Sequence, residues 1–458
     1  MSSCKRSKEI LVFINSIYPG LNIGMYIMNK KKAAFITLGC KVNTYETEGM
    51  KRIFEKGGYQ VVDPECAADV YVINTCTVTH LSDRKSRQMI RRAIKKNPSA
   101  VIAAVGCYAQ VAPEEVSALE GVNLVVGNNH KSEILQLVEE VNRNTQKVVL
   151  SERKRMESYE ELWAGSYSGH TRAFLKIQDG CNQFCSYCII PYARGGIRSR
   201  NPGSILREAE ELSSNGFKEI VLTGIHLNSY GMETEEITLI DVIESLTRVN
   251  GIERIRLGSL EPFYITEEFI SKLTKMKKLC PHFHLSLQSG CDETLQRMNR
   301  RYTTKEYYSI VENIRNSYTD AAVTTDIMAG FPGETNEEFQ RTCDFVHSIG
   351  FSQAHIFQYS ARKGTRASDI PHQIPSSVKE QRSKVLFKIC EESKNKYRDQ
   401  YLGRTMEVLF EKRQGKLWEG HTRNYIPVGV ASDSVLSGEI RNIYLTEREK
   451  EIILGQIV

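Results

Sequence analysis

The sequence GCNQFCSYCIIPYARG, residues 180–195, decides what the central part of this chain is expected to build. Its three cysteines, Cys181, Cys185 and Cys188, follow the spacing Cys-x3-Cys-x2-Cys. Three close thiolates can hold a 4Fe-4S cluster, which normally takes four, so one iron keeps a free coordination position. A small molecule can bind at that position, as it does at catalytic metal sites that stay open. The spacing therefore predicts a reactive cluster.

A zinc site is the first alternative for these cysteines. Structural zinc takes four Cys or His ligands, and the residues that follow the triplet offer no further Cys or His. Free cysteine is also among the most buried residue types, so three ordinary core thiols are the second alternative. The spacing favours the iron–sulfur interpretation over both.

The length of the chain, 458 residues, is more than one hydrophobic core usually organises, so several domains are expected. A hydrophobic fraction of 41% with 25% charged residues is typical of a soluble globular protein. The 12 cysteines are too few for a disulfide scaffold, and metal-binding thiols must be reduced, which favours a cytoplasmic location. No run of 18 apolar residues exists, so no membrane association is expected. The net charge of +6 permits an anionic partner.

The first 30 residues start with basic residues and a short apolar stretch, which Asn15 and Pro19 interrupt before a signal peptide is complete. Met25 and Met28 lie just upstream of the first clear strand pattern. We therefore expect residues 1–30 to be an extension without function that results from an upstream start site.

Three apolar runs in the region 31–147 each end on a cysteine: AAFITLGC on Cys40, VYVINTC on Cys76 and VIAAVGC on Cys107. The runs alternate with helical patterns, which predicts an α/β domain with an open parallel sheet. Because the carboxyl ends of parallel strands share one edge of the sheet, the three thiols are expected to converge. They predict a second cluster site, again with one open iron.

The segment that follows Cys76 predicts a basic helix that ends before Pro98, with Ser82 or Asp83 as its cap. Such a charge run is usually a solvated helix face, but beside a cluster site it also suits the phosphates of a nucleic acid. We expect RNA contacts from the basic residues that recur at helical spacing on one face: Arg84, Arg87, Arg91 and Lys95.

The region 167–397, which follows a linker over 148–166, contains six apolar runs that alternate with amphipathic helices. Six strand–helix units are fewer than the eight of a closed barrel and predict a partial (β/α)6 barrel. The Cys181 loop leaves the first strand at the carboxyl edge, where such folds bind ligands, and Thr335 is expected to cap a later helix. Cofactor-binding candidates at the other strand ends are Gly224, Glu261, Gln288, Ser289, Asp326 and Gly330.

The region 398–458 has only short strand patterns, which predicts a small β-barrel of OB-like size. Lys and Arg are balanced by Asp and Glu in this region, so its net charge does not favour RNA binding. Bases stack on aromatic rings, however, which makes Trp418 and Tyr425, with Arg423 nearby, candidate RNA contacts.

Six motifs in chain order resemble the radical S-adenosylmethionine (SAM) methylthiotransferase family: TLGCKVNTYETE, VINTCTVT, VGCYAQ, CNQFCSYCIIPYARG, LQSGCDETLQRMNR and TDIMAGFPGET. The C-terminal module is similar to the TRAM domain of that family, so the resemblance covers nearly the whole chain from about residue 31. It implies two 4Fe-4S clusters. One, on Cys181, Cys185 and Cys188, binds SAM; an auxiliary one is held by the three sheet-edge cysteines.

The resemblance also implies two uses of SAM. One SAM donates its methyl group to a sulfur at the auxiliary cluster, and a second is reductively cleaved to a radical that removes hydrogen from an unreactive carbon. The methylated sulfur then joins that carbon. A cofactor is needed for this, because no side chain generates such a radical unaided. The implied partners are a tRNA anticodon stem-loop, an electron donor such as flavodoxin or ferredoxin, and a sulfur source.

Branches of the family act on tRNA adenosine 37 carrying an isopentenyl group, on the same position carrying threonylcarbamoyl, or on a ribosomal-protein aspartate. The stretch CSYCIIPYARGGIRSR, with Tyr192, Ala193 and Arg194, is most similar to the threonylcarbamoyladenosine branch. Because the stretch follows the third cluster cysteine, its side chains are expected to border the substrate. The other two substrates stay open as alternatives, as does a non-catalytic iron–sulfur protein that carries electrons or binds RNA.

Overall fold

The computed structural model describes residues 30–142, 144–152, 158–165, 167 and 171–458. They form two compact units. Unit 1 contains the described residues up to Ala164 together with the segment Ile189–Gly196, and unit 2 contains Gly165–Cys188 and Ile197–Val458. The extension expected over residues 1–30 lies, except for Lys30, outside the described residues.

Unit 1 is built on a parallel sheet, as expected, with the strand order β2-β1-β3-β4-β5-β6. The strands are β1 (Lys32–Thr37), β2 (Gln60–Val62), β3 (Val70–Thr75), β4 (Val101–Gly106), β5 (Leu124–Val126) and β6 (Lys147–Val149). The helices are α3 (Lys41–Lys56), α4 (His80–Lys96), α5 (Cys107–Val111), α6 (Pro113–Ser117), α7 (Ile134–Glu140) and α8 (Ile190–Arg194).

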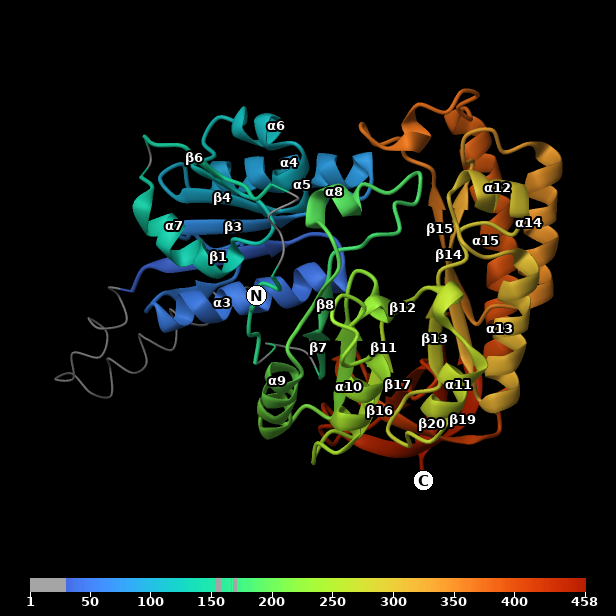
Figure 1. Cartoon of the computed structure of the whole chain (residues 1–458). Helices are drawn as coiled ribbons and strands as arrows, with labels where there is room; N and C mark the ends of the chain where they lie inside the picture. Colours follow the sequence, from blue (N-terminus) through green and yellow to red (C-terminus); the bar gives the residue numbers. More distant parts are fainter. Residues whose placement is uncertain (1–29, 143, 153–157, 166, 168–170) are drawn as a thin grey trace. The chain divides into compact units, whose positions relative to one another are not determined.

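The central strand β3 explains why the sheet is covered on both faces. All six of its residues are buried, and successive side chains of a strand point to opposite faces. Val70 and Val72 pack in a core with α3 and α7, whereas Tyr71 and Ile73 pack in a second core with α4, α5 and α6. A helix layer therefore lies on each face of the sheet (Figure 1).

Helix α4 begins at His80, and Thr79 caps it by accepting a hydrogen bond from the Ser82 backbone N–H. The cap expected at Ser82 or Asp83 is wrong. Thr79 has the extended backbone that an N-cap requires, and the Asp83 carboxylate instead accepts a hydrogen bond of 2.8 Å from the Thr77 hydroxyl.

Unit 2 begins with the expected strand–helix repeats. Its parallel strands are β7 (Arg172–Lys176), β10 (Glu219–Thr223), β11 (Arg254–Leu257), β12 (Ser259–Leu260), β13 (His282–Leu285), β14 (Ala322–Ala329) and β15 (Gln353–Gln358). They pair as β7-β10-β11 and β12-β13-β14-β15, which keeps the chain order of a partial barrel (Figure 1). Gly258 lies between the two sheets, and a Cβ there would lie 2.8 Å from the Leu222 carbonyl oxygen, so the position has no room for a side chain.

The helices of this part are α9 (Pro202–Ser214), α10 (Leu239–Thr247), α11 (Glu267–Thr274), α12 (Asp292–Arg297), α13 (Thr304–Ser317), α14 (Asn336–Ile349) and α15 (Ser376–Asp399). The cap expected at Thr335 is confirmed, since Thr335 and Glu338 form a capping box at the start of α14. No helix in the described part of the chain has the length and apolar character needed to cross a membrane.

The C-terminal strands close into the small barrel that the sequence predicts, in the order β16-β17-β18-β20-β19. They are β16 (Thr405–Gln414), β17 (Leu417–Thr422), β18 (Pro427–Ala431), β19 (Ile440–Glu449) and β20 (Ile452–Ile457). The barrel belongs to the same compact unit as the strand–helix repeats, so the domain boundary expected at residue 397 stays a prediction.

Two buried arginines join the barrel to β10 and β11. Arg254 donates to the Glu407 carboxylate at 2.9 Å and to the His421 carbonyl at 3.0 Å. Arg256 pairs with Glu219 at 2.7 Å and also donates to the Arg423 carbonyl. The barrel therefore lies at the end of these strands opposite to their carboxyl edge.

Replacing Glu219 with Gln is expected to destabilise unit 2. Burial opposes ionisation of this carboxyl, but Arg256, Arg172 and Arg254 outweigh burial and lower its pKa to about 2. Removing one partner of a buried ion pair costs about 3–5 kcal/mol. Chemical denaturation at neutral pH should show a loss of this size. The contribution of Glu219 in the wild type should be present above about pH 4.5 and be lost as the pH falls toward 2.

Glu244→Gln is the matched control, because Glu244 pairs with Arg248 on an exposed helix face. Surface pairs contribute about 0–1 kcal/mol. Equal losses of unfolding free energy in the two variants would contradict the role given to Glu219.

Candidate functional site

The three cysteines of unit 1 lie at the carboxyl ends of adjacent strands. Cys40 follows β1, Cys76 comes directly after β3, and Cys107 follows β4 as the first residue of α5. The turn that carries Cys40 packs against Cys76, since a Cβ on Gly39 would lie 2.9 Å from the Cys76 Sγ. The fold therefore brings together three thiols that are distant in the sequence.

The surroundings of Cys76 and Cys40 favour the protonated thiol. Burial, together with the nearby Cys107 and Cys40 thiols, raises the pKa of Cys76 to about 11. Cys40 is solvent-exposed, yet desolvation by the chain around it raises its pKa, and Arg194 opposes this effect. A metal that replaces the protons would remove this cost, because the thiolate is the form that binds metal.

No three His, Cys, Asp or Glu side chains among the described residues are close enough together to bind a single metal ion. A cubane cluster does not need such a group, because each thiolate binds a different iron and the sulfurs stay further apart. The donor set in unit 1, three thiols at one sheet edge, thus fits a cluster better than a mononuclear metal.

Two asparagines fix the segments that carry these cysteines. Asn43 donates from Nδ2 to the Leu38 carbonyl at 2.7 Å and to the Thr75 carbonyl at 3.0 Å, which ties together the ends of β1 and β3. Asn128 donates to the Ala193 carbonyl at 2.8 Å, and its Nδ2 lies 3.7 Å from the Cys107 Sγ. Both side chains are buried.

The stretch Tyr192–Arg194, expected to border the substrate, is split between the surface and the interior of unit 1. Tyr192 is 41% exposed. Arg194 is fully buried and donates to the Glu46 carboxylate at 2.7 Å and to the Asn43 side-chain oxygen at 2.8 Å. Arg194 is therefore part of the interior that supports the cysteines. Tyr192, in contrast, is accessible to solvent.

In unit 2, the Cys181–Cys188 loop follows the short strand β8 (Gln178–Asp179), just beyond β7. The Cys188 backbone N–H donates to the Cys185 carbonyl at 2.9 Å, which closes a turn between two of the three cysteines. Neighbouring segments hold the loop. The Asn299 side chain donates to the Phe184 carbonyl at 3.0 Å, and the Ser186 backbone N–H donates to the Met298 carbonyl. All three cysteine side chains are half-buried.

Arg300 is the residue at this loop that sequence reasoning missed. Its Nη1 lies 3.2 Å from the Cys185 Sγ, and its Nη2 donates to the Glu261 carboxylate at 2.7 Å and to the Ser286 carbonyl at 3.1 Å. Burial raises the pKa of Glu261, and Arg300 opposes that shift. Its place in LQRMNRRYT, far from the cysteines in sequence, gives no signal of this contact.

His226 is a second residue that was missed. It lies beyond the carboxyl end of β10 and is only 6% exposed, and neither ring nitrogen has a hydrogen-bond partner within the described parts of the chain. Burial, together with the charges of Arg300 and Arg301, lowers its pKa to about 4, so the ring is neutral at physiological pH. The side-chain oxygen of the nearby Asn228 accepts a hydrogen bond of 2.7 Å from the Glu261 backbone N–H.

The other cofactor-binding candidates are placed differently. Gly224 follows β10 with no room for a side chain, because a Cβ would lie 2.8 Å from the Gln178 side-chain oxygen. Gln288 and Gly330 also follow strands and both have positive φ angles. Ser289 also follows β13 but is buried against Thr342 of α14, whereas Asp326 lies in the middle of β14 beside His284.

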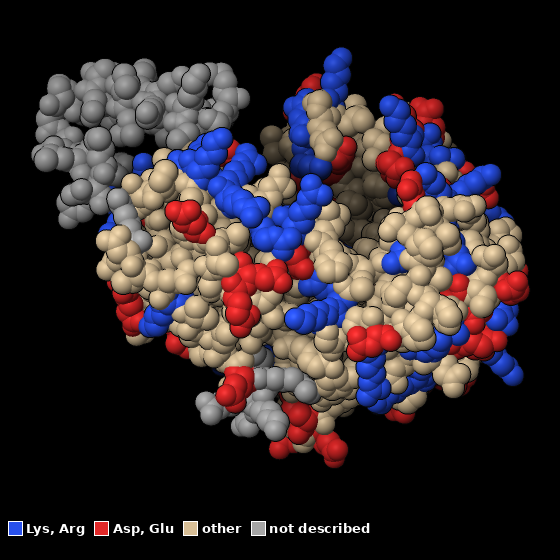
Figure 2. Space-filling model, turned by 90° about the horizontal axis from the view of Figure 1, so that it is seen from above, with Lys and Arg blue, Asp and Glu red and all other residues tan. Residues whose placement is uncertain are grey.

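The basic face of α4 is exposed in part. Arg84, Arg91 and Lys95 are exposed and form no ion pair with another described residue, whereas Arg87 donates to the Tyr108 hydroxyl. On the face drawn in Figure 2, Lys and Arg side chains gather in groups with Asp and Glu between them. Three of the four predicted RNA-contacting residues on α4 are thus available to a phosphate backbone.

The barrel residues expected to contact RNA instead pack inside unit 2. Trp418 is 7% exposed in the barrel core. Arg423 donates to the Leu279 carbonyl at 3.0 Å, and the Tyr425 ring stacks on His421 and His282 with ring centroids 4.6 and 4.9 Å apart. These contacts join the barrel to the strand–helix repeats. Trp418 is buried, whereas Arg423 and Tyr425 are half-exposed, and their RNA contacts stay a prediction.

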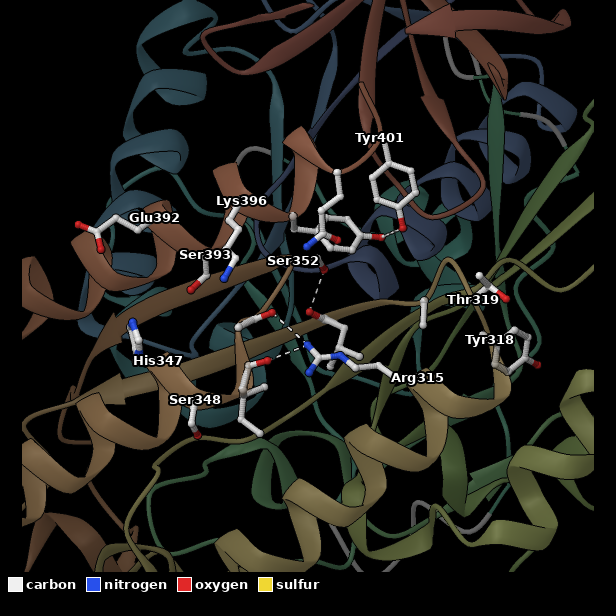
Figure 3. Close-up of a pocket in the computed structure, with 16 residues that line it drawn as sticks. Arg315, Tyr318, Thr319, His347, Ser348, Ser352, Glu392, Ser393, Lys396 and Tyr401 are labelled. Atoms are coloured by element: carbon white, nitrogen blue, oxygen red, sulfur yellow. Dashed lines mark hydrogen bonds between the residues drawn. The ribbon is translucent and has the colours of Figure 1, made fainter. Parts of the chain in front are cut away.

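A cavity of about 620 Å³ lies near the amino end of β14, the end opposite to the carboxyl edge (Figure 3). Its lining includes Ser352, Lys396 and Tyr401. Arg315, also in the lining, donates to the Ile349 and Gly350 carbonyls at 2.7 and 3.0 Å. The cavity therefore belongs to the packing of α13, α14 and α15.

Residues 175–346 match the model of the radical SAM superfamily, and residues 32–127 match that of an uncharacterized protein family, UPF0004. In a structural comparison, the radical S-adenosylmethionine methyltransferase TsrM from Kitasatospora setae, solved with cobalamin and a [4Fe-4S] cluster bound, gives a TM-score of 0.57 at 16% identity over 74% of this chain and 77% of that chain. At this identity the likeness concerns the fold alone.

The curated relatives are much closer in sequence. The threonylcarbamoyladenosine tRNA methylthiotransferase MtaB of Bacillus subtilis is 40% identical, with 93% of this chain and 96% of that protein covered. MtaB of Aquifex aeolicus is 41% identical, with 87% of this chain and 96% of that protein covered. A tRNA-2-methylthio-N(6)-dimethylallyladenosine synthase of Caldicellulosiruptor saccharolyticus is 33% identical, with 96% of this chain and 95% of that protein covered. With these identities over nearly full length, the chain belongs to the radical SAM methylthiotransferase family.

Proposed function

We propose that this protein is a tRNA methylthiotransferase that converts N6-threonylcarbamoyladenosine at position 37 to its 2-methylthio derivative. One observation carries the proposal: the chain holds two separate sets of three cysteines, each beyond the carboxyl ends of parallel strands. Two open clusters match two tasks, radical generation and sulfur transfer. The relatives at 40 and 41% identity carry the threonylcarbamoyladenosine substrate in their names, which supports this branch over the others.

Cys181, Cys185 and Cys188 would hold the radical-generating cluster, and Cys40, Cys76 and Cys107 the auxiliary cluster. When bound, the two clusters and SAM supply the carbon radical and the methylated sulfur, which no side chain provides. The chain's own contribution is to hold each set of thiols at a sheet edge and to leave the fourth ligand position of each cluster free.

Three residues beside the Cys181 loop would orient SAM and the cluster ligands. Arg300 places a positive charge 3.2 Å from the Cys185 Sγ, and Glu261 balances that charge. His226 offers uncharged ring nitrogens to a polar ligand at the same edge. Gly224, Gln288 and Gly330 would let the backbone approach SAM, and Glu261 also stays a candidate for contact with it.

The exposed basic residues of α4 would bind the phosphates of the anticodon stem-loop. The reaction also needs an electron donor, such as flavodoxin or ferredoxin, and a sulfur source. We place the protein in the cytoplasm, where tRNA is found and thiols stay reduced.

Single cysteine substitutions should separate the two cluster tasks. After anaerobic reconstitution with iron and sulfide and reduction by dithionite, Cys185→Ala is expected to abolish SAM cleavage, because it removes a ligand of the radical-generating cluster. Cys76→Ala should retain SAM cleavage but form no methylthio product on tRNA. Chromatography of 5′-deoxyadenosine and of the modified nucleoside measures both. Methylthiolation by Cys76→Ala would contradict the auxiliary site. If the reconstituted wild type fails to cleave SAM, a non-catalytic iron–sulfur protein becomes the better interpretation.

The substrate is tested by nucleoside mass spectrometry of tRNA from cells with and without the gene. Loss of the gene should remove 2-methylthio-N6-threonylcarbamoyladenosine and leave N6-threonylcarbamoyladenosine in its place. The 2-methylthio-N6-threonylcarbamoyladenosine signal could instead stay unchanged while methylthio-isopentenyladenosine or the modified ribosomal-protein aspartate is lost. That result would assign the chain to another branch of the family.

Charge removal on α4 should weaken tRNA binding. The triple variant Arg84→Ala, Arg91→Ala, Lys95→Ala is expected to lower the slope of log affinity against log salt by about two to three, roughly 0.7–0.9 for each phosphate that the variant no longer neutralises. Filter binding at several salt concentrations measures the slope. The control removes three exposed cations that pair with acids in unit 2, through Arg248→Ala, Lys272→Ala and Lys384→Ala. Equal effects in both triple variants would contradict a specific role of α4.

A further inference from the structure

Unit 1 contains a buried group of charged residues that the proposed reaction does not use directly. Glu46 of α3 accepts from Arg194 Nη1 at 2.7 Å through one oxygen and from Lys131 Nζ at 2.7 Å through the other. All three side chains are fully buried. Taking three charges out of water is costly, so such a group is retained in an interior only with well-made contacts.

Each of the two cations is linked to the cysteines through one asparagine. Arg194 Nη2 donates to the Asn43 Oδ1 at 2.8 Å, and Asn43 holds the carbonyls of Leu38 and Thr75, which lead into Cys40 and Cys76. The same Asn43 Oδ1 lies 3.9 Å from the Cys40 Sγ. The route from Arg194 thus reaches the Cys40 thiol and the backbone that leads into Cys76.

Lys131 makes the equivalent connection to the third thiol. Its Nζ donates to the Asn128 Oδ1 at 2.6 Å, and the Asn128 Nδ2 lies 3.7 Å from the Cys107 Sγ. Asn128 also binds the carbonyl of Ala193, the residue before Arg194. One carboxylate therefore organises two cations, two asparagines and, through them, all three cysteines of unit 1.

The segment that supplies Arg194 is Ile189–Gly196, which packs in unit 1 although it directly follows Cys188 in the sequence. The Arg194 guanidinium forms a fork that bonds two partners in fixed directions, which a lysine cannot reproduce. The position of the guanidinium is thus fixed by Glu46 and Asn43 together.

We propose that Arg194, Lys131 and Glu46 are positioning residues of the auxiliary cluster site, which fix its cysteine-bearing strand ends through Asn43 and Asn128 and set the reduction potential of the cluster bound there. This inference rests on the proposed function, because it assumes a cluster on Cys40, Cys76 and Cys107. Protein charges and hydrogen bonds near the cluster sulfurs are the means by which a chain tunes such a potential. Cations favour the reduced, more negative cluster, and a nearby carboxylate opposes it.

The test uses the full chain with Cys181→Ala, Cys185→Ala and Cys188→Ala as the parent, so that only the auxiliary cluster is reconstituted. Dithionite supplies one electron to the cluster, no bond is formed or broken, and electron paramagnetic resonance reports the reduced fraction at each potential. Arg194→Gln should make the cluster harder to reduce, and Glu46→Gln should make it easier. Each change is expected to alter the ratio of reduced to oxidised cluster at fixed potential on the order of tenfold, about 59 mV for one electron.

Two further variants separate charge from structure. Arg194→Lys keeps the charge but loses the fork, so its potential should stay near that of the parent while its iron content falls. The double variant Arg194→Gln, Glu46→Gln removes both partners, and its potential should return toward the parent. The double variant also serves where a single one fails to fold, because it leaves the net charge of the buried group unchanged, although Lys131 then keeps only Asn128 as its partner. Glu48→Gln is the matched control, because Glu48 also lies on α3 and its carboxylate pairs with Lys51. It should leave the reduction potential of the cluster unchanged.

Shifts of the same sign in Arg194→Gln and Glu46→Gln, or no shift in either, would overturn the inference, because damage to the fold alone has no reason to follow the sign of the charge. A parent that binds no iron would overturn the proposed auxiliary site itself, and this inference with it. The two failures are distinguished by the iron and sulfide content of the parent, measured before any variant is compared.

Discussion

The structure depends on one constraint: parallel strands in a sheet deliver their carboxyl ends to the same edge. In unit 1 this constraint brings Cys40, Cys76 and Cys107 together from three separate strand–helix repeats. In unit 2 it places the Cys181 loop on the edge that also carries Gly224, Glu261 and Gly330. Both sites are thus built by backbone geometry first, and the side chains around them adjust charge and hydrogen bonding afterwards.

The sequence was sufficient to predict the parts of the molecule that follow from local pattern. The parallel sheet of unit 1, the strand–helix repeats and the closed C-terminal barrel each have a periodicity or spacing that can be counted, and each is confirmed. The cap of α14 was predictable for the same reason, because Thr335 and Glu338 have the spacing of a capping box. The cap of α4 was not, because Asp83 is bonded to Thr77 and Thr79 takes the extended conformation instead.

Contacts between distant segments were beyond the reach of sequence patterns. Arg194 was expected to border the substrate because it follows a cluster cysteine, yet it is buried on Glu46. Arg300 reaches Cys185 across more than a hundred residues of sequence, and Tyr425 stacks on His282. In each case a polar or aromatic residue that is typical of a ligand contact also holds two segments together. Only the tertiary structure distinguishes these two uses.

We expect one chain to build two cluster sites from three cysteines each. Iron analysis with Mössbauer spectroscopy of the anaerobically reconstituted full chain counts these clusters. About eight irons per chain in two 4Fe-4S clusters are expected for the wild type, and about four irons when Cys40, Cys76 and Cys107, or Cys181, Cys185 and Cys188, are replaced by Ala. Four irons in the wild type, or no loss of iron on replacing Cys40, Cys76 and Cys107, would contradict this expectation.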